Sequence, residues 1–343
     1  MRLRLIKIQN KKNRFHLLKR KYNNFQRFFK KNIPRVIKKT FNNINNIINI
    51  PYPLKQNYNP VIPLIIYQTW HTKNLPPLME NAVNKIKLLN PRFNYQLFDD
   101  YDCREFIKNN FHISVLHAYD SLIPGAYKAD LWRYCILYKK GGIYLDIKYI
   151  PHNGFRFISL TEKEHFVYDI DGINIYNALM VTKPNNQILL KAIYKIVDNV
   201  KNKVYGTSCL QPTGPVLLKE ACNDEDNNNI VDMKHKYYLS FDNRFILFNG
   251  YHVLKSYNGY IVESSKFQKT EHYSGLWNKR QIYRDIPISQ YKYINPIKYV
   301  EEAVIEAEEE AVIEAVIEAE EEAVEEAVEE AVEEALIEDK SNE

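Results

Sequence analysis

The chain has 343 residues, and its formal charge of +5 hides a very uneven distribution of charge along the sequence. Residues 1–50 carry 15 Lys and Arg and no Asp or Glu, whereas residues 300–343 carry 20 Asp and Glu and a single Lys. Such asymmetry indicates tails attached to a globular unit. At 45% hydrophobic residues the chain is too apolar to be disordered throughout, and no apolar run approaches the roughly 20 residues of a membrane-spanning helix. We therefore expect no transmembrane segment.

Composition divides the chain into three parts. Residues 1–59 form a basic segment with an Asn-, Ile- and Pro-rich linker, residues 60–299 form the domain, and residues 300–343 form an acidic tail built on a Glu-Glu-Ala-Val repeat. Because the basic segment mixes Lys and Arg with Phe, Leu and Ile, residues 1–50 could contact an anionic membrane surface or nucleic acid. The alternative is a solvated basic tail. The acidic repeat is a low-complexity appendage, either a solvated helix or disordered.

Strand and helix patterns alternate along the first half of the domain. An apolar run at 61–67 predicts a buried strand, 78–89 has the apolar spacing of a helix, and 95–98 predicts a short strand followed by acidic residues. Residues 126–138 predict a helix that a Gly-Gly pair ends, and 143–145 predict the next strand. This alternation predicts an α/β fold with a largely parallel sheet.

Four side chains converge in the last part of this pattern. Asp130 and Arg133 are three apart and share a helix face, while Tyr144 and Asp146 are two apart and share a strand face. Ligands of open α/β sheets bind beyond the carboxyl ends of strands, where Asp146 is placed. A carboxylate there suits Mg²⁺ or Mn²⁺, which in turn could hold a diphosphate. The alternative is a surface pair of Asp130 with Arg133 and a loop cap at Asp146.

Five motifs follow one another along the domain: IPLIIYQTWHTKNLPP (62–77), AYKADLWRYCILYKKGGIYLD (126–146), NALMVTKPNNQILLKAI (177–193), LQPTGP (210–215) and HYSGLWN (272–278). Together they resemble glycosyltransferase family 32, the Asp-x-Asp (DXD) family of yeast initiating α-1,6-mannosyltransferase and capsular polysaccharide sugar transferases. The resemblance covers roughly residues 60–280 and implies a GT-A fold, a Rossmann-like single domain that transfers a sugar from a nucleotide donor with retention.

The resemblance also assigns roles to residues of the first two motifs. Trp70 would stack on the nucleotide base, and Asp130 and Arg133 would bind the sugar and phosphate parts of the donor. Tyr144 would line the donor site, and Asp146 would be the first Asp of the Asp-x-Asp motif and the catalytic residue.

Residues of the later motifs follow in the same way. His272 lies where GT-A enzymes often supply a further metal contact, and Ser274 and Trp277 resemble the loop that closes over the donor phosphates. Asn177 and Thr213–Pro215 match motifs of the family without an assigned role.

The sequence departs from the family at one decisive position. Where the family has Asp-x-Asp, this chain has Asp146-Ile147-Lys148, so a cation replaces the second carboxylate. Asp146, His272 and the diphosphate could hold the metal, or Lys148 could itself supply positive charge to the donor diphosphate. A third alternative is a fold that has lost activity. We expect an active enzyme that uses Mn²⁺ or Mg²⁺.

The function predicted from the sequence is that of a glycosyltransferase, a hexosyltransferase acting on a UDP- or GDP-linked sugar and a glycan or protein acceptor. The alternatives are a donor-binding pseudoenzyme and a protein that binds nucleic acid or a membrane surface through its basic tail. The sequence shows no secretory signal, and its composition resembles that of large DNA virus proteins. We therefore expect a cytoplasmic protein, in the host cytoplasm or the virion if it is viral, and not a secreted one.

Overall fold

The structure is a computed structural model that describes residues 49–222, 230–237 and 244–291. The acidic tail predicted at 300–343 and the basic segment up to residue 48 lie outside the described residues. Within the described ranges no helix combines the length and the apolarity that crossing a membrane requires.

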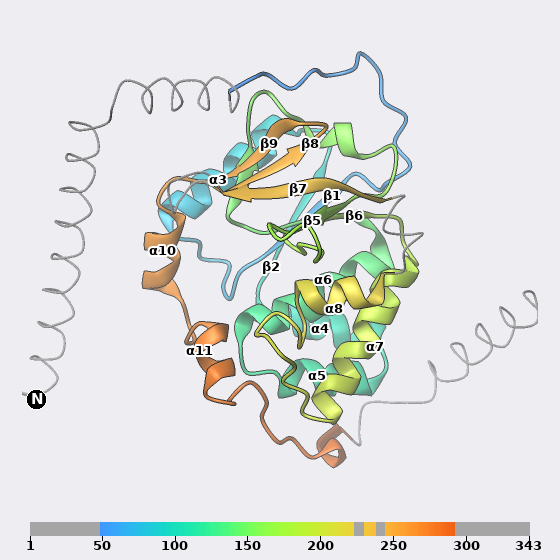
Figure 1. The fold of residues 1–343 in the computed structure, drawn as a ribbon, viewed down its shortest axis with the longest axis vertical. Coiled ribbons are helices and arrows are strands. Elements are labelled where there is room, and N and C mark those ends of the chain that lie inside the picture. The colour runs from blue at the N-terminus through green and yellow to red at the C-terminus, as the bar shows by residue number, and fades with distance from the viewer. Residues whose placement is uncertain (1–48, 223–229, 238–243, 292–343) are drawn as a thin grey trace, which may run out of the picture.

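Helices and strands alternate up to β3, and later in the described chain three consecutive strands precede the last helices (Figure 1). The strands are β1 (Ile65–Thr69), β2 (Asn94–Phe98), β3 (Gly142–Leu145), β4 (Tyr149–Pro151), β5 (Phe166–Tyr168), β6 (Leu179–Thr182), β7 (Val231–Tyr237), β8 (Arg244–Phe248) and β9 (Tyr251–Ser256). The α-helices are α3 (Pro77–Leu89), α4 (Asp100–Asn110), α5 (Ile113–Ser121), α6 (Gly125–Lys140), α7 (Gln187–Lys201), α8 (Pro215–Ala221), α10 (Tyr260–Phe267) and α11 (Tyr273–Asn278), and the 3₁₀ helices are η1 (Phe157–Leu160) and η2 (Ile288–Tyr291).

The strands of the described chain form two sheets. The first has the order β2-β1-β3-β6, in which β1 runs parallel to β2 and β3 while β6 is antiparallel to β3. The second has the order β4-β9-β8-β7-β5, and only its β5–β7 pair is parallel. Helices α4 to α8 gather below the sheets in Figure 1. The α/β prediction is confirmed.

The expected parallel pairing holds for the three strands that were predicted, β1, β2 and β3, whereas the second sheet was not predicted and is mostly antiparallel. Strands β8 and β9 form an antiparallel hairpin, and Asn249 and Gly250 connect them with φ of 50° and 81°. Positive φ at both central residues is typical of the two-residue turn that Asn-Gly favours. The Asn-Gly pair was therefore a sequence signal for an antiparallel hairpin.

One predicted strand is shorter than expected, and the structure adds a helix after β2 that was not predicted. The first strand begins at Ile65, because Pro63 lacks an N–H and the N–H groups of Val61 and Ile62 donate to the carbonyl of Thr161 instead. Helix α4, which the sequence reading did not predict, starts in the acidic run after β2. There Asp99 accepts hydrogen bonds from the N–H groups of the first turn as an N-cap.

The segment before β1 lies against the domain, although we expected residues 51–59 to be linker. The ring of Tyr52 packs against Phe155, Phe248 and Tyr251, with centroids 5.1–6.1 Å apart. Its N–H donates to the carbonyl of Asn153 over 2.8 Å.

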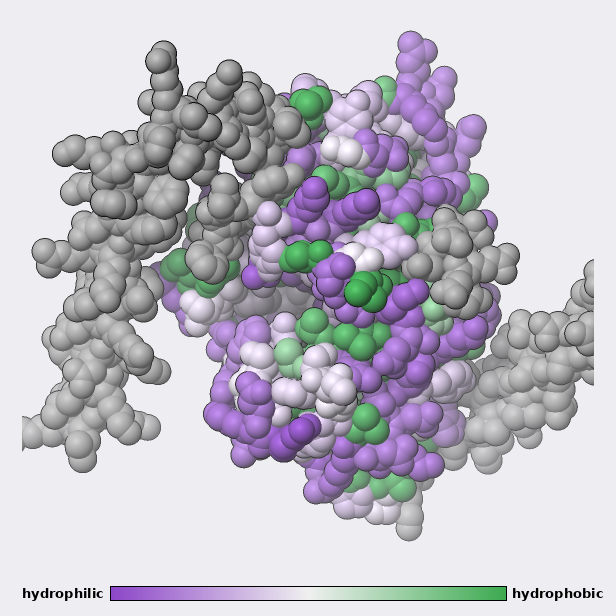
Figure 2. All heavy atoms as spheres, in the orientation of Figure 1, coloured by the Kyte–Doolittle hydropathy of each residue, from purple (hydrophilic) through white to green (hydrophobic). Residues whose placement is uncertain are grey.

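Strand β3 separates two apolar clusters. Tyr144 faces the cluster that contains α6 and its neighbouring helices, while Ile143 and Leu145 face the cluster between the two sheets. Because side chains alternate along a strand, Tyr144 and Asp146 both point toward α6. Figure 2 shows a mostly hydrophilic face with small hydrophobic patches, as expected for a fold that buries its apolar residues in these clusters.

A glycine turn joins α6 to β3. Helix α6 ends at Lys140, and Gly141 follows with φ of 60°, a conformation that L-residues with a side chain rarely adopt. A Cβ on Gly141 would also lie 2.7 Å from the backbone nitrogen of Pro184. The turn therefore requires glycine, and it sets the position of Asp146 relative to α6.

We predict that Gly141→Ala lowers the free energy of unfolding by about 1–3 kcal/mol more than Gly154→Ala. Both glycines have positive φ, but a Cβ on Gly154 would meet nothing within 4 Å, so it is the matched control for backbone strain. Chemical denaturation followed by circular dichroism measures the difference. Equal losses for the two variants would show that the contact with Pro184 does not constrain the turn.

Candidate active site

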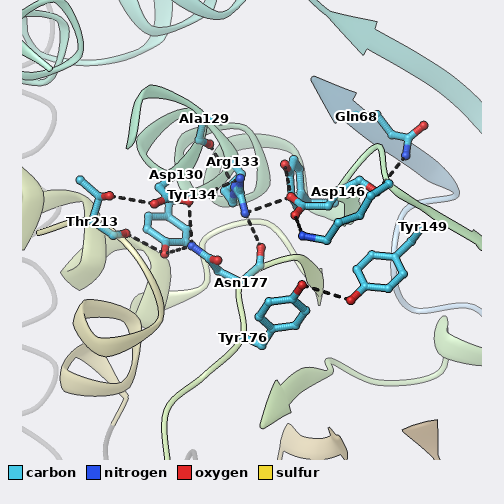
Figure 3. Close-up of polar contacts among 12 residues, drawn as sticks. Gln68, Ala129, Asp130, Arg133, Tyr134, Asp146, Tyr149, Tyr176, Asn177 and Thr213 are labelled. Carbon is cyan, nitrogen blue, oxygen red and sulfur yellow. Dashed lines mark hydrogen bonds and ion pairs between the residues drawn. The ribbon is translucent and has the colours of Figure 1, made fainter. Parts of the chain in front are cut away.

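Asp146 directly follows β3, at the carboxyl end of that strand, as the sequence predicts. Its N–H donates to the carbonyl of Ala178 over 2.7 Å, and its carbonyl accepts from the side-chain amide of Gln68 over 3.4 Å. Gln68 lies in β1 and Ala178 immediately precedes β6. The first sheet therefore holds the backbone of Asp146 from both sides (Figure 3).

The carboxylate of Asp146 accepts from three side chains. The hydroxyl of Tyr144 donates to Oδ1 over 2.9 Å, and Nη1 of Arg133 lies 3.2 Å from the same oxygen. Nζ of Lys148 donates to Oδ2 over 2.5 Å. Two of the three donors carry a positive charge, so both oxygens are already engaged with cations of the protein.

These charges set the ionisation of the cluster. Burial alone raises the pKa of Asp146, but Lys148 and Arg133 outweigh burial and hold that pKa below its ordinary value. Burial alone lowers the pKa of Lys148, but the carboxylate of Asp146 outweighs it and raises that pKa above its ordinary value. Asp146 and Lys148 are therefore both charged at neutral pH.

Arg133 connects α6 to both carboxylates of the site. Its Nη2 lies 3.4 Å from Oδ1 of Asp130, and its Nη1 also donates to the carbonyl of Asn177 over 2.7 Å. The guanidinium stacks over the ring of Tyr144 at 4.4 Å from the centroid. The side chain is 7% exposed, so its orientation is fixed by the protein.

Asp130 is enclosed by hydrogen bonds within the protein. Asn177 donates to its Oδ1 over 2.9 Å, and the hydroxyl of Thr213 donates to its Oδ2 over 2.7 Å. Asn177 also donates to the hydroxyl of Tyr134, which donates to the carbonyl of Thr213. These contacts give Asn177 and Thr213 a structural role: they hold Asp130 against Arg133. The role of Asp130 toward a donor stays a prediction.

Lys148 is surrounded by aromatic rings. Its ammonium lies 5.4 Å from the ring centroid of Tyr149 and 5.3 Å from that of Tyr176, and the two tyrosine hydroxyls are 3.1 Å apart. The ring of His235 stacks on Tyr176 at 3.9 Å, and Nδ1 of His235 lies 3.0 Å from Asp169. The tyrosines and the histidine thus restrict the position of the ammonium.

Trp70 follows β1 and packs beside α3. The backbone N–H of Trp70 donates to the carbonyl of Phe98 over 3.2 Å. The centroid of its ring lies 4.8 Å from that of His71. The indole nitrogen is buried and has no hydrogen-bond partner in the described part of the chain. Stacking on a nucleotide base stays a prediction.

Helix α11 lies next to α6 but makes its polar contacts elsewhere. His272 caps the helix by accepting from the N–H of Ser274 over 3.3 Å, and Trp277 donates to the carbonyl of Tyr205 over 2.7 Å. Among the described residues, no hydrogen bond or ion pair joins His272, Ser274 or Trp277 to Asp146. The structure therefore shows no direct contact within the pair that we predicted to bind metal, and the role of His272 toward a metal stays a prediction.

The divalent cation that the resemblance implies does not fit the residues around Asp146. Mn²⁺ and Mg²⁺ prefer oxygen ligands, but here the carboxylate oxygens of Asp146 pair with two cationic side chains and accept from a hydroxyl. Within the described residues no group of three or more His, Cys, Asp or Glu side chains could hold a metal ion. Lys148 stands where the second carboxylate ligand would be.

Sequence reasoning missed the residues that reach this cluster from distant segments. Tyr149 directly follows Lys148, but Tyr176 and His235 lie 28 and 87 positions after Lys148. Tyr176 immediately precedes the predicted motif at 177–193, which was the available signal. For His235 no local pattern distinguishes it from other histidines.

Comparisons with known proteins find similarity over the segment that contains most of this cluster. Residues 76–167 match the family described as "Glycosyltransferase sugar-binding region containing DXD motif". That segment includes α6 with Asp130 and Arg133, the glycine turn, and β3 with Asp146 and Lys148. The resemblance to DXD glycosyltransferases is thereby confirmed.

Individual relatives are similar over parts of their length. The chain is 40% identical over 96 residues to inositol phosphoceramide mannosyltransferase 3 of Schizosaccharomyces pombe, covering 28% of this chain and 27% of that protein. It is 28% identical over 191 residues to the uncharacterized glycosyltransferase L373 of Acanthamoeba polyphaga mimivirus, covering 51% of this chain and 72% of that protein. The chain thus spans about a quarter of the yeast relative and most of the viral one.

A solved structure, titled "PaToxG Glycosyltransferase", superposes with a TM-score of 0.36 at 18% sequence identity. The match covers 54% of this chain and 74% of that chain.

Asp130 should give the fold a distinctive pH dependence. Burial raises the pKa of Asp130 to about 6, although Arg133 and Thr213 oppose the shift. The carboxyl of Asp130 then binds a proton more tightly in the folded than in the unfolded state. The gain in free energy of unfolding that follows from protonation is complete below about pH 4 and is lost as the pH rises through about 6. Asp130→Asn removes this titration. Between pH 4 and 7, the stability of the parent relative to Asp130→Asn should fall by about 3 kcal/mol.

Asp171 provides a control of opposite sign. Burial alone would raise its pKa, but hydrogen bonds from the backbone N–H groups of Ile173 and Asn174 lower it overall. The stability of the parent relative to Asp171→Asn should therefore stay level down to about pH 4 and fall as the pH is lowered further. Denaturant titrations at each pH measure both trends. The same sign for both variants would contradict the assignment of Asp130.

Proposed function

We propose that this protein is a glycosyltransferase that moves a sugar from a nucleotide-sugar donor to a hydroxyl of an acceptor. One observation supports this most: the cluster of Asp146, Arg133 and Lys148 lies at the carboxyl end of β3, inside the segment that matches the DXD family. Beyond such strand ends, α/β folds bind their ligands. A buried cluster with fixed cations is suited to an anionic donor.

The proposed reaction proceeds with retention at the anomeric carbon. The bond from this carbon to the donor diphosphate breaks, and a bond to the acceptor oxygen forms on the same face of the sugar. The leaving phosphate oxygen takes the proton of the acceptor hydroxyl, so no side chain is required as a general base. Negative charge grows on the leaving diphosphate, and fixed cations stabilise it best when they are already oriented.

The residues of this chain take distinct parts in the proposed reaction. Arg133 and Lys148 supply positive charge beside the donor, and Asp146 orients both of them from the end of β3. Asp130 acts as a positioning residue through Arg133. Trp70 supplies an apolar surface for the base. No step runs through a divalent cation, because the donor set at Asp146 does not fit one.

The names of relatives suggest which substrates to test first. Several are named as inositol phosphoceramide mannosyltransferases or mannosyl phosphorylinositol ceramide synthases. We therefore propose GDP-mannose as the first donor, followed by UDP-linked hexoses. Acceptors to test are phosphoinositol ceramide, simple glycans and glycoproteins.

We predict donor turnover by the full chain, and its loss in Asp146→Asn. That substitution keeps the shape of the side chain but removes the charge that orients Arg133 and Lys148, so turnover should fall about 100-fold or more. Release of nucleoside diphosphate from GDP-mannose and UDP-sugars, with and without acceptors, measures it. The control is Arg104→Met, which breaks a charge pair with Asp120 between α4 and α5 and should leave turnover unchanged.

Two other results would contradict this function and support a different one. Donor binding without turnover in every combination would identify a pseudoenzyme. Absence of both binding and turnover, together with salt-sensitive nucleic-acid binding that disappears on deletion of residues 1–48, would favour a role for the basic segment, which lies outside the described residues.

A further inference from the structure

The second position of the Asp-x-Asp motif carries an ammonium in place of a metal-binding carboxylate. Asp146 and Lys148 are two residues apart, and their charged groups meet at 2.5 Å. A divalent cation at Asp146 would have to displace Lys148 and approach Arg133, and both would repel it. The ammonium of Lys148 therefore occupies the place beside Asp146 that a divalent cation would need.

A second cation lies along the same run of aromatic rings as Lys148. Arg244, at the start of β8, lies 5.1 Å from the ring centroid of Tyr237, its partner on β7. The ring of Tyr237 is 5.1 Å from that of His235, which stacks on Tyr176 beside Lys148. One continuous set of rings therefore links the two cations, although β8 and the end of β3 are almost 100 positions apart in sequence.

Arg244 retains capacity to bind an anion. Its guanidinium lies 5.1 Å from the ring centroid of Tyr237, and its Nε is buried without a hydrogen-bond partner in the described ranges. No carboxylate among the described residues forms an ion pair with Arg244. A buried arginine N–H without a partner calls for an acceptor oxygen. Phosphate oxygens fit this role well, because planar guanidinium donors match their geometry and charge.

We propose that Lys148 and Arg244 together bind the diphosphate of the nucleotide-sugar donor, and that Lys148 takes the place of the divalent ion, so that donor binding and transfer need no metal. This proposal rests on the proposed function, because it concerns the donor of that reaction. It adds Arg244, from a strand outside the DXD segment, to the site.

The first test uses the unchanged full chain. Binding of GDP and of UDP is measured by calorimetry in excess EDTA and again in Mn²⁺. At least one of the two should bind, with a dissociation constant that differs by less than about threefold between the two conditions. Binding that is lost in EDTA and restored by Mn²⁺ would overturn the proposal while leaving the glycosyltransferase function in place. Failure of both nucleotides under both conditions would overturn the proposed function itself.

The second test locates the diphosphate. Lys148→Met and Arg244→Met should each weaken binding of the nucleoside diphosphate about tenfold or more, since each removes a charge-assisted hydrogen bond. Binding of the monophosphate GMP or UMP should change much less. Lys148→Arg, which keeps the charge, should recover part of the affinity, and Lys191→Met on the exposed face of α7 is the matched control.

Folding of the variants is checked by near-ultraviolet circular dichroism and melting temperature. Affinity of a folded Lys148→Met or Arg244→Met within twofold of the parent would overturn the assignment of that residue. The reverse design, Lys148→Asp, restores the second acid of the motif and should bind the nucleoside diphosphate only in Mn²⁺. Tight binding by Lys148→Asp in EDTA would show that the lysine does not replace a metal.

Discussion

The site depends on one buried guanidinium. Arg133 of α6 contacts Asp146 after β3 and Asp130 on its own helix, and it donates to the carbonyl of Asn177 before β6 (Figure 3). Removing one partner from a buried, hydrogen-bonded charge pair typically costs about 3–5 kcal/mol, so these contacts are mutually dependent. Arg133 thereby fixes the spacing between α6 and the end of β3, where the proposed donor site lies.

The local part of this arrangement could be predicted from the sequence. Spacings of three on a helix and two on a strand bring Asp130 to Arg133 and Tyr144 to Asp146, because these periodicities follow from backbone geometry alone. The glycine turn was equally readable, since Gly141 occupies a conformation that other residues avoid. The α/β class followed from the same short-range patterns.

The remainder depends on contacts between distant segments. Tyr176 lies beside Lys148 from the segment before β6, while His235 and Arg244 stand on β7 and β8 of the second sheet. No local pattern specifies the full strand order of that sheet. Farther along the chain, His272 and Ser274 have the spacing of a helix N-cap. In the structure they form the N-cap of α11. Family resemblance assigned them a place near the donor, and the local N-cap, which uses Nδ1 of His272, is a second role that the spacing alone predicts.

Charge explains how one substitution can alter the site without disrupting it. Replacing the second aspartate of the motif by Lys148 changes the formal charge by two units, from −1 to +1, which equals the charge of one divalent cation. With Asp130, Asp146, Arg133, Lys148 and Arg244 ionised, the cluster carries a net +1. A cluster with aspartate at position 148 would carry −1, and it would reach +1 only with a divalent ion bound. The anionic diphosphate then meets the same total charge in both cases, but in this chain the charge is covalently attached and oriented by tyrosines before the donor arrives.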